Sequence, residues 1–176
     1  MSFFKTVLTL VVIAWLSPEL QAQNTLKIKR KQLGNLAEIA RANPDANYII
    51  IKRARLKSLP PELTLFKKLD SLDLYGNKIE QLPDSAWGML KNVKYLRLGK
   101  NPMEEIPAGI TQMEKLASLD LWNSEIFFIH PSFLSMADQI KMLDIRMTRL
   151  SRSQTQQIHD AFPNTEVKAT WQCNCK

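Results

Sequence analysis

The sequence predicts an α/β solenoid, with a parallel sheet built from short repeated strands and a helical cap at each end. Three observations carry this prediction: an apolar pattern that recurs every 23 or 24 residues, a proline motif with the same period, and apolar residues at helical spacing on both sides of the repeats. At 176 residues, 45% apolar and 23% charged, the chain has the size and composition of one globular domain.

Residues 1–22 have the features of a secretory signal peptide and are expected to lie outside the fold. Lys5 supplies the positive charge, an apolar run follows from Thr6 to Leu16, and Ala22 offers a small residue for cleavage. This run is shorter than the roughly 20 residues that a membrane-spanning helix needs. The sequence therefore predicts export to the periplasm, the cell surface or the extracellular space.

Residues 23–45 are predicted to form a basic leader followed by an N-terminal helical cap. Apolar side chains at helical spacing from Leu33 to Ala40 indicate the helix, and Asn43-Pro44-Asp45 ends it. A solenoid exposes its core at both ends unless atypical segments cover it, so this helix is the expected cover at the N-terminal end.

Five copies of the pattern Leu-x-x-Leu-x-Leu-x-x-Asn-x-Leu occupy residues 46–152. They begin near residues 46, 69, 93, 116 and 140. Because alternate residues of a strand point to opposite faces, successive copies can stack as a parallel sheet over one continuous core. Asn77 and Asn101 keep the asparagine of the pattern, and a buried amide there is expected to satisfy backbone groups between turns.

A second motif, an aliphatic residue followed by Pro, follows three of the copies with the same period. It occurs at Leu59-Pro60-x-x-Leu63, Leu82-Pro83-x-x-Ala86 and Ile106-Pro107-x-x-Ile110. Together the two motifs resemble the leucine-rich repeat family, in its 23-residue class with Leu-Pro-x-x-Ile/Leu, and with the leader the chain is similar to secreted bacterial members. The resemblance implies a right-handed horseshoe whose parallel sheet lines a concave face, and that face commonly binds protein partners.

Residues 153–176 are predicted to close the C-terminal end with a cap helix, an edge strand and a cysteine-containing tail. Ser151-x-x-Gln154 is a capping box that starts the helix, and Thr165–Ala169 is the expected strand. Cys173 and Cys175 are expected to form a disulfide within the tail, or to pair between chains, if the compartment is oxidising.

The strand and strand-end positions that face away from the core are rich in Tyr, Trp, Arg and Asp, and the resemblance places them on the concave face. The candidate binding residues are Tyr48, Lys52, Asp73, Tyr75, Tyr95, Arg97, Asp120, Trp122, Asp144 and Arg146. Tyr, Trp and Arg are enriched in protein interfaces, so a protein or peptide ligand is favoured. The alternative is that these aromatic residues only stack between neighbouring strands.

One column of this face contains Asp73, Arg97, Asp120 and Asp144. Strands stack about 4.8 Å apart, so carboxylates in such a column can in principle hold Ca²⁺. Because Arg97 separates Asp73 from Asp120, we expect an ion-pair ladder there instead.

The net charge of +7 belongs to one end of the chain. Residues 23–60 contain nine Lys or Arg and two acidic residues, whereas residues 61–176 contain fourteen of each. Lys27, Lys29, Arg30 and Lys31 therefore either form a peripheral docking patch for anionic lipid or glycan, or belong to a solvated leader. Export argues against nucleic acid as a partner.

The sequence shows no catalytic constellation. Glycine-rich phosphate loops and nucleophile elbows are absent, and the two histidines, His130 and His159, fall in different parts of the repeat array. A zinc site from His159, Cys173 and Cys175 lacks an evident fourth ligand. We therefore predict a non-catalytic, monomeric binding module without metal or cofactor. An adhesion module acting through the basic segment, and a spacer within a larger assembly, are the alternatives.

Overall fold

A computed structural model describes residues 24–170 of the chain. The predicted signal peptide, residues 1–22, and the two cysteines, Cys173 and Cys175, lie outside these residues. No helix within residues 24–170 is long and apolar enough to cross a lipid bilayer.

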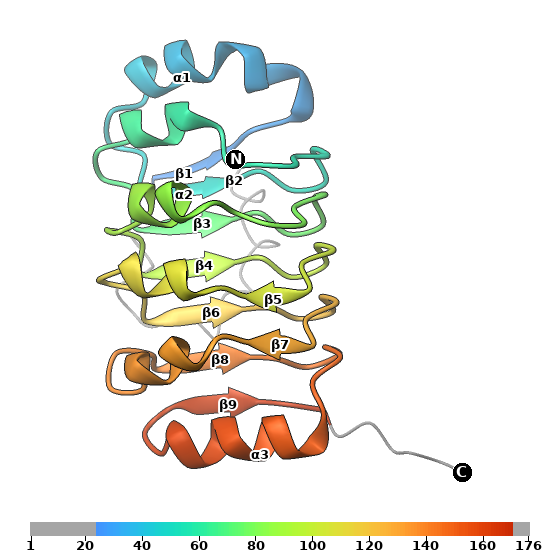
Figure 1. Cartoon of the computed structure of the whole chain (residues 1–176). Helices are drawn as coiled ribbons and strands as arrows, with labels where there is room; N and C mark the ends of the chain where they lie inside the picture. Colours follow the sequence, from blue (N-terminus) through green and yellow to red (C-terminus); the bar gives the residue numbers. More distant parts are fainter. Residues whose placement is uncertain (1–23, 171–176) are drawn as a thin grey trace, which may run out of the picture.

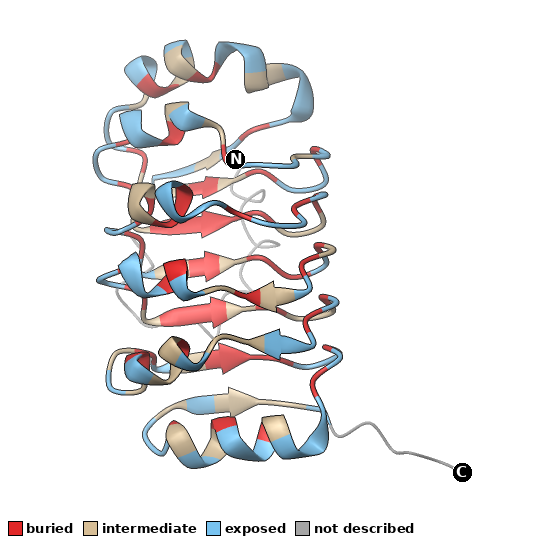
Figure 2. Ribbon diagram, viewed as in Figure 1, coloured by how far each residue is buried: buried red, intermediate tan, exposed pale blue. Residues whose placement is uncertain are grey.

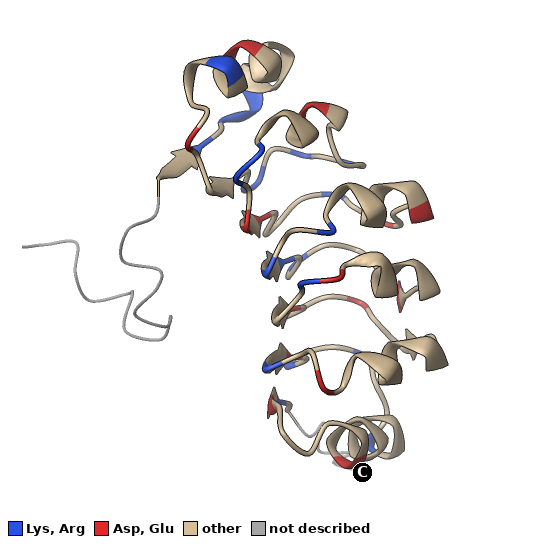
Figure 3. Ribbon diagram, turned by 90° about the vertical axis from the view of Figure 1, so that its left-hand side faces the viewer, with Lys and Arg blue, Asp and Glu red and all other residues tan. Residues whose placement is uncertain are grey.

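Seven parallel strands form the main sheet, in the order β1-β2-β3-β4-β6-β8-β9, which is also their order along the chain (Figure 1). Their bounds are β1 Thr25–Lys27, β2 Tyr48–Ile50, β3 Ser71–Asp73, β4 Tyr95–Arg97, β6 Ser118–Asp120, β8 Met142–Asp144 and β9 Glu166–Lys168. Seen from the side in Figure 3, the strands follow a gentle arc with the helical turns on its outer side. The sheet therefore lines the concave face, and the α/β solenoid fold is as predicted.

Short helical segments return the chain from each strand to the next. They are η2 Arg30–Asn35, α1 Leu36–Ala42, η3 Pro61–Leu65, α2 Asp84–Met89, η4 Ala108–Gln112, η5 Pro131–Met136 and α3 Arg152–Ala161. The proline motif starts the segments between the repeats: Pro60, Pro83 and Pro107 are the N-cap residues of η3, α2 and η4. Proline fits there because the first helical turn leaves backbone N–H groups unpaired in any case.

A second, two-stranded parallel sheet on one flank was not predicted from the sequence. It pairs β5, Glu105–Ile106, with β7, Phe128–Ile129. Two-residue strands are too short to give a periodic signal, so only the tertiary arrangement shows them.

Part of the basic leader is a strand, which corrects the sequence-based interpretation of residues 23–45. Thr25–Lys27 pairs with β2, and the Ile28 N–H continues the ladder by donating to the Ile50 carbonyl at 2.8 Å. Leu26 packs against the core and Ile28 is buried, while Lys27 and Lys29 point outward. Alternating apolar and charged residues are typical of a strand, but the many lysines of this segment led to its interpretation as a charged leader.

Both ends of the core are covered. At the N-terminal end, Leu36 and Ala40 of α1 are buried, and the predicted helix begins with the 3₁₀ turn η2. At the C-terminal end the capping box is present: the Gln154 N–H donates to Ser151 Oγ at 3.2 Å, and the Ser151 N–H donates to Gln154 Oε1 at 2.9 Å. The predicted edge strand follows as β9.

The core is a ladder of aliphatic side chains from the strand centres (Figure 2). These residues are fully or almost fully buried: Ile49, Leu72, Leu96, Leu119 and Leu143. Each packs between its equivalents in the turns above and below, because the register pairs them directly. A three-residue strand has no stability of its own, so this stacking is what keeps each turn folded.

The same backbone conformation recurs where the chain leaves each strand. Residues Arg53, Gly76, Lys100, Asn123 and Met147 all have φ between 51° and 72°, in the left-handed region. Their positions follow the repeat period, so this turn is a property of the solenoid rather than of any one sequence. Only Gly76 and Asn123 are of types that adopt it readily, and Arg53, Lys100 and Met147 adopt it at a cost in energy.

The predicted asparagine ladder is present between the turns. Asn77 Oδ1 accepts from the N–H groups of Ala54 and Leu56, and Asn77 Nδ2 donates to the carbonyls of Ile51 and Leu74. Asn101 repeats the arrangement one turn later, with Oδ1 accepting from Ile79 and Nδ2 donating to Leu74 and Leu98. At the same position, the hydroxyl groups of Ser124 and Thr148 each donate to the carbonyl three residues earlier, those of Leu121 and Ile145.

We expect Asn77→Ala to lower the free energy of unfolding by about 3 kcal/mol, because it leaves buried donors and acceptors of two turns unpaired. Ser124→Ala, which removes a single hydrogen bond, should cost only about 1 kcal/mol. Urea unfolding followed by circular dichroism measures both. Equal losses in the two variants would contradict the role assigned to the asparagine ladder.

Candidate binding site on the concave face

The register of the sheet arranges the outward-facing residues in three columns that run along the solenoid. The first column is Thr25, Tyr48, Ser71, Tyr95, Ser118, Met142 and Glu166; the second is Lys27, Ile50, Asp73, Arg97, Asp120, Asp144 and Lys168. The third, which continues the strands, is Lys52, Tyr75, Gly99, Trp122 and Arg146. All ten predicted site residues lie in these columns. Parts of them line a concavity of about 970 Å³ that extends from β1 to β9.

The second column contains the predicted ion-pair ladder. Arg97 Nε lies 2.7 Å from Asp120 Oδ2, and Arg97 Nη1 lies 3.7 Å from Asp73 Oδ2. Lys52 Nζ approaches the same Asp73 oxygen to 2.7 Å from the third column. Asp73 is only 1% exposed, and its pairing with these two cations offsets the cost of burying its carboxylate.

Each aspartate of the second column also positions the residue two places further along the chain. Asp73 Oδ1 accepts from the Tyr75 N–H at 3.0 Å, and Asp120 Oδ1 accepts from the Trp122 N–H at 2.9 Å. Asp144 repeats the contact with the Arg146 N–H at 3.1 Å. These local turns fix the backbone from which the third-column side chains project.

Just beyond the ends of β3 and β6, the rings of Tyr75 and Trp122 stack on each other. The ring centroids are 5.9 Å apart and the planes are 13° from parallel. The two residues are two strands apart, a separation of roughly 9.6 Å at about 4.8 Å per strand, so the rings meet by leaning over the strand between them. Gly99 lies on the strand extension between them, and a Cβ there would lie 2.6 Å from the Trp122 carbonyl oxygen, so the backbones of these two turns approach too closely for a larger residue.

Arg97 also belongs to this cluster, through its contact with Tyr75. Its guanidinium carbon lies 4.5 Å from the centroid of the Tyr75 ring, which is a cation–π contact. One side chain therefore joins the ion-pair ladder of the second column to the aromatic stack of the third. The result is a platform of Tyr75, Trp122 and Arg97 whose geometry is set before any ligand arrives.

Burial and neighbouring charges shift three pKa values on this face. Burial, with a further contribution from Asp73, raises the pKa of Tyr48 to about 12, and Arg97 opposes it weakly. Burial also raises the pKa of Asp120, against the opposing effects of the Trp122 N–H and of Arg97. The pKa of Arg146 is raised by its hydrogen bonds to Asp144, made through Nε at 2.9 Å and Nη2 at 2.6 Å.

The two ends of the concavity differ in charge. Lys27, Lys29, Arg30, Lys52 and Arg53 line its N-terminal end, and within residues 24–170 only Lys52 of these five forms an ion pair. Lys31 is exposed on η2. The C-terminal end is lined by Asp120, Asp144 and Lys168.

Residues 24–170 contain no group of three His, Cys, Asp or Glu side chains arranged to hold a metal ion. In the second column Arg97 lies between Asp73 and Asp120, as the sequence order requires. His130 caps η5, where its Nδ1 accepts from the Ser132 N–H at 3.2 Å. His159 lies on α3, at the far end of the solenoid.

Two features of this face were missed in the sequence. Lys27 was assigned to a leader, whereas it belongs to the second column. Gly99 was given no role, although a Cβ there would lie 2.6 Å from the Trp122 carbonyl oxygen of the next turn. The sequence does indicate a special role for Gly99, because the other residues of the third column all have large side chains.

No family model matches the chain, and no curated protein matches it in sequence. Its structure is similar to that of a leucine-rich repeat protein of Leptospira interrogans, with a TM-score of 0.59 and 25% sequence identity over 75% of this chain. The match covers 33% of the Leptospira protein, so the chain spans about a third of its length. The fold is thus that of a leucine-rich repeat solenoid, which in general is a protein-interaction fold rather than an enzyme fold.

We expect Tyr48 to ionise near pH 12 instead of its ordinary 10.0. The fold favours protonated Tyr48, so its contribution to stability is complete below pH 10 and is lost as the pH rises toward 12. Tyrosinate absorbance during a pH titration should therefore show a late step that Tyr48→Phe removes. A late step that persists in Tyr48→Phe would contradict this assignment.

Proposed function

We propose that this chain is a non-catalytic leucine-rich repeat module of the 23-residue class, whose concave face binds a protein or peptide. The observation that carries the proposal is the platform of Tyr75, Trp122 and Arg97, where β3, β4 and β6 end. Tyr, Trp and Arg are the residue types that dominate binding energy in protein interfaces. Because the platform is already ordered, a ligand would lose little side-chain entropy on contacting it.

The charge pattern indicates which residues of the face are available to a ligand. Arg97 forms ion pairs with Asp120 and Asp73. These three residues therefore hold the platform in place and offer no unpaired charge to a ligand. Tyr95 in the first column is half-buried, while Arg146 is exposed at one end of the platform. We infer that Tyr75, Tyr95 and Trp122 supply contact area, and that Arg146, which is exposed although it pairs with Asp144, supplies a directed polar contact.

The predicted signal peptide supports the further proposal that the protein is exported. Residues 1–22 have the charged start, the apolar run and the small residue that such a segment needs. The partner is therefore to be sought in the envelope or in the medium.

We predict that Tyr75→Ala/Trp122→Ala abolishes capture of the partner that the wild type captures from envelope and medium fractions. Each lost anchor should weaken binding by about 2 kcal/mol or more. Mass spectrometry after affinity capture, followed by titration of the captured partner, measures the effect.

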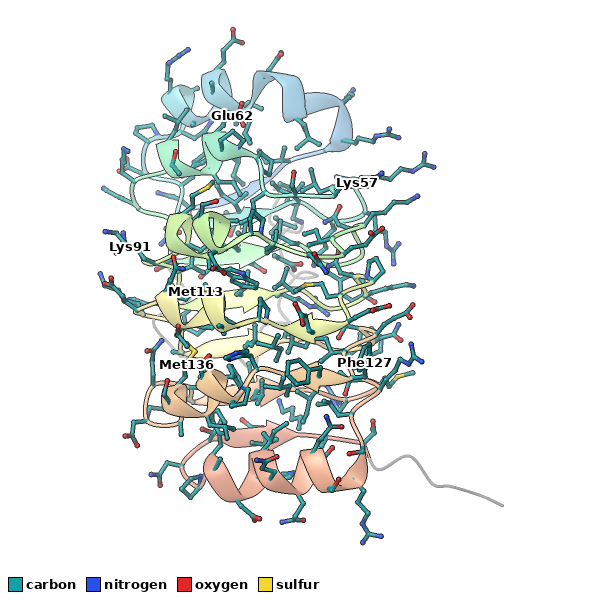
Figure 4. The ribbon with its side chains drawn as sticks, in the orientation of Figure 1. Lys57, Glu62, Lys91, Met113, Phe127 and Met136 are labelled. Atoms are coloured by element: carbon teal, nitrogen blue, oxygen red, sulfur yellow. The ribbon has the colours of Figure 1, made fainter. Side chains whose placement is uncertain are left out.

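The matched control is Lys91→Ala, which removes an exposed side chain near the end of α2, on the helical side (Figure 4). Urea unfolding of both variants separates loss of binding from loss of folding. If the folded double variant captures the same partners with the same affinity as the wild type and Lys91→Ala, binding through the platform is excluded.

A second candidate function is adhesion to an anionic lipid or glycan through the basic end of the concavity. The observation that favours it is that four cations lie together at the N-terminal end of the concavity, namely Lys27, Lys29, Arg30 and Arg53. In the described part of the chain, none of the four forms an ion pair. Cations held on a strand and a cap lose less freedom on binding than cations on an unstructured leader would.

We expect the triple variant Lys27→Gln/Lys29→Gln/Arg30→Gln to weaken binding to heparin, or to vesicles with anionic headgroups, by about tenfold or more at low salt. Substitution is preferable to deletion, because Thr25–Lys27 is strand β1. Lys67→Gln/Lys91→Gln/Lys115→Gln removes the same charge after η3, α2 and η4 and is the control. Equal binding by the two triple variants, or binding insensitive to salt, would reject the adhesion function.

A further inference from the structure

Two adjacent phenylalanines are exposed on the flank of the solenoid, away from the concave face. Phe127 is 48% exposed and Phe128, the first residue of β7, is 42% exposed. Figure 4 shows Phe127 on the same flank as Lys57 and on the opposite side from Lys91. Neither phenylalanine belongs to the buried core.

The other turns of the solenoid show that the fold does not need apolar residues at these two positions. The equivalent pairs, one repeat apart, are Lys57-Ser58, Glu80-Gln81, Glu104-Glu105 and Ser151-Arg152. Every other turn places polar or charged side chains there, as expected for a surface that only meets water. The phenylalanines are therefore specific to one turn, and the repeat pattern does not require two exposed rings there.

The surroundings of the two rings are acidic. They line a hollow of about 710 Å³ together with four carboxylates, Glu80, Glu104, Glu105 and Glu125, and one cation, Lys57. Glu125 is paired with Arg149 at 3.6 Å, and Arg149 lies 6.0 Å from the centre of the Phe127 ring. Within residues 24–170, no ion pair involves Glu80, Glu104 or Glu105, so three carboxylates beside the rings are available.

We propose that this hollow, which we call the Phe flank (Phe127, Phe128, Glu80, Glu104, Glu105 and Glu125), binds a basic segment of a partner protein through a bulky apolar side chain. The apolar side chain packs against Phe127 and Phe128, and neighbouring Lys or Arg residues pair with Glu104 and Glu105. Charge complementarity selects this partner, because a rim of carboxylates repels acidic proteins and anionic lipid headgroups. The Phe flank is separate from the concave face, so this inference does not depend on the function proposed above.

Selection from a displayed library of random peptides on the full chain tests the proposal directly. Peptides are selected on the wild type and counter-selected on Phe127→Ser/Phe128→Gln, whose new residues are of the types found at the equivalent positions of other turns. We expect the surviving peptides to combine a bulky apolar residue with Lys or Arg. A synthetic copy of such a peptide should bind the double variant about tenfold or more weakly than the wild type, the loss expected for a central aromatic anchor.

Two matched controls make the result specific. Leu65→Ser removes another exposed apolar side chain, 41% exposed on η3, and should leave peptide affinity unchanged. Glu104→Gln/Glu105→Gln should weaken binding and reduce its dependence on salt, whereas Glu62→Gln/Glu114→Gln, elsewhere on the surface, should not. Urea unfolding confirms that each variant is folded.

Three results would overturn the proposal. If the peptides that remain after counter-selection lack basic residues, charge does not determine which ligand binds. Failure to recover any peptide that distinguishes the wild type from Phe127→Ser/Phe128→Gln would show that the rings bind no such segment. Concentration-dependent self-association of the wild type in sedimentation, abolished in the double variant, would identify a second copy of this chain as the occupant.

Discussion

Every turn of this solenoid buries its apolar face only against the turns above and below it. A strand such as Ser71–Asp73 is three residues long and contributes one core side chain, Leu72, that is covered by its equivalents Ile49 and Leu96. The strands must therefore keep strict register, because a slip of one residue would turn the core leucine outward. The recurring left-handed residues and the asparagine ladder maintain that register, the first by turning the chain out of each strand and the second by joining adjacent turns.

Strict register also determines the electrostatics of the concave face. Equivalent residues lie about 4.8 Å apart in columns, so the charge of a side chain on one strand acts directly on the side chains of the strands beside it. Asp73 tolerates near-complete burial because Arg97 and Lys52 lie on either side of it. Asp120 and Asp144 are neighbours of like charge. The repulsion between their carboxylates is offset because Arg97 pairs with Asp120 and Arg146 pairs with Asp144. The charged residues of this column therefore stabilise the sheet by pairing with one another. The aromatic rings of the platform are the groups that a ligand can contact.

The repeat made most of the fold predictable from sequence, because a fixed period places each residue relative to its equivalents. The five predicted strand positions, the capping box at Ser151 and the Asp–Arg–Asp order all follow from counting along the chain. Strand β1 was missed because Leu26 and Ile28 alternate with lysines in a segment dominated by charge. The Tyr75–Trp122 stack was missed for a different reason. Counting places these residues two strands apart, and the repeat period does not encode the side-chain orientations that bring the ring centroids to 5.9 Å.

One turn bears both surfaces proposed here. Trp122 belongs to the platform and Phe127 to the Phe flank, five positions further along the chain. Between them, Asn123 turns the chain with a φ of 58°, and Ser124 and Ile126 are buried, with Ser124 Oγ bonded to the Leu121 carbonyl. This short, anchored segment separates the two faces without a hinge, so a ligand on one face does not require the other to move. A solenoid with two fixed sites can hold two segments of one partner, or two partners, at a set distance, and the second contact then forms at high effective concentration.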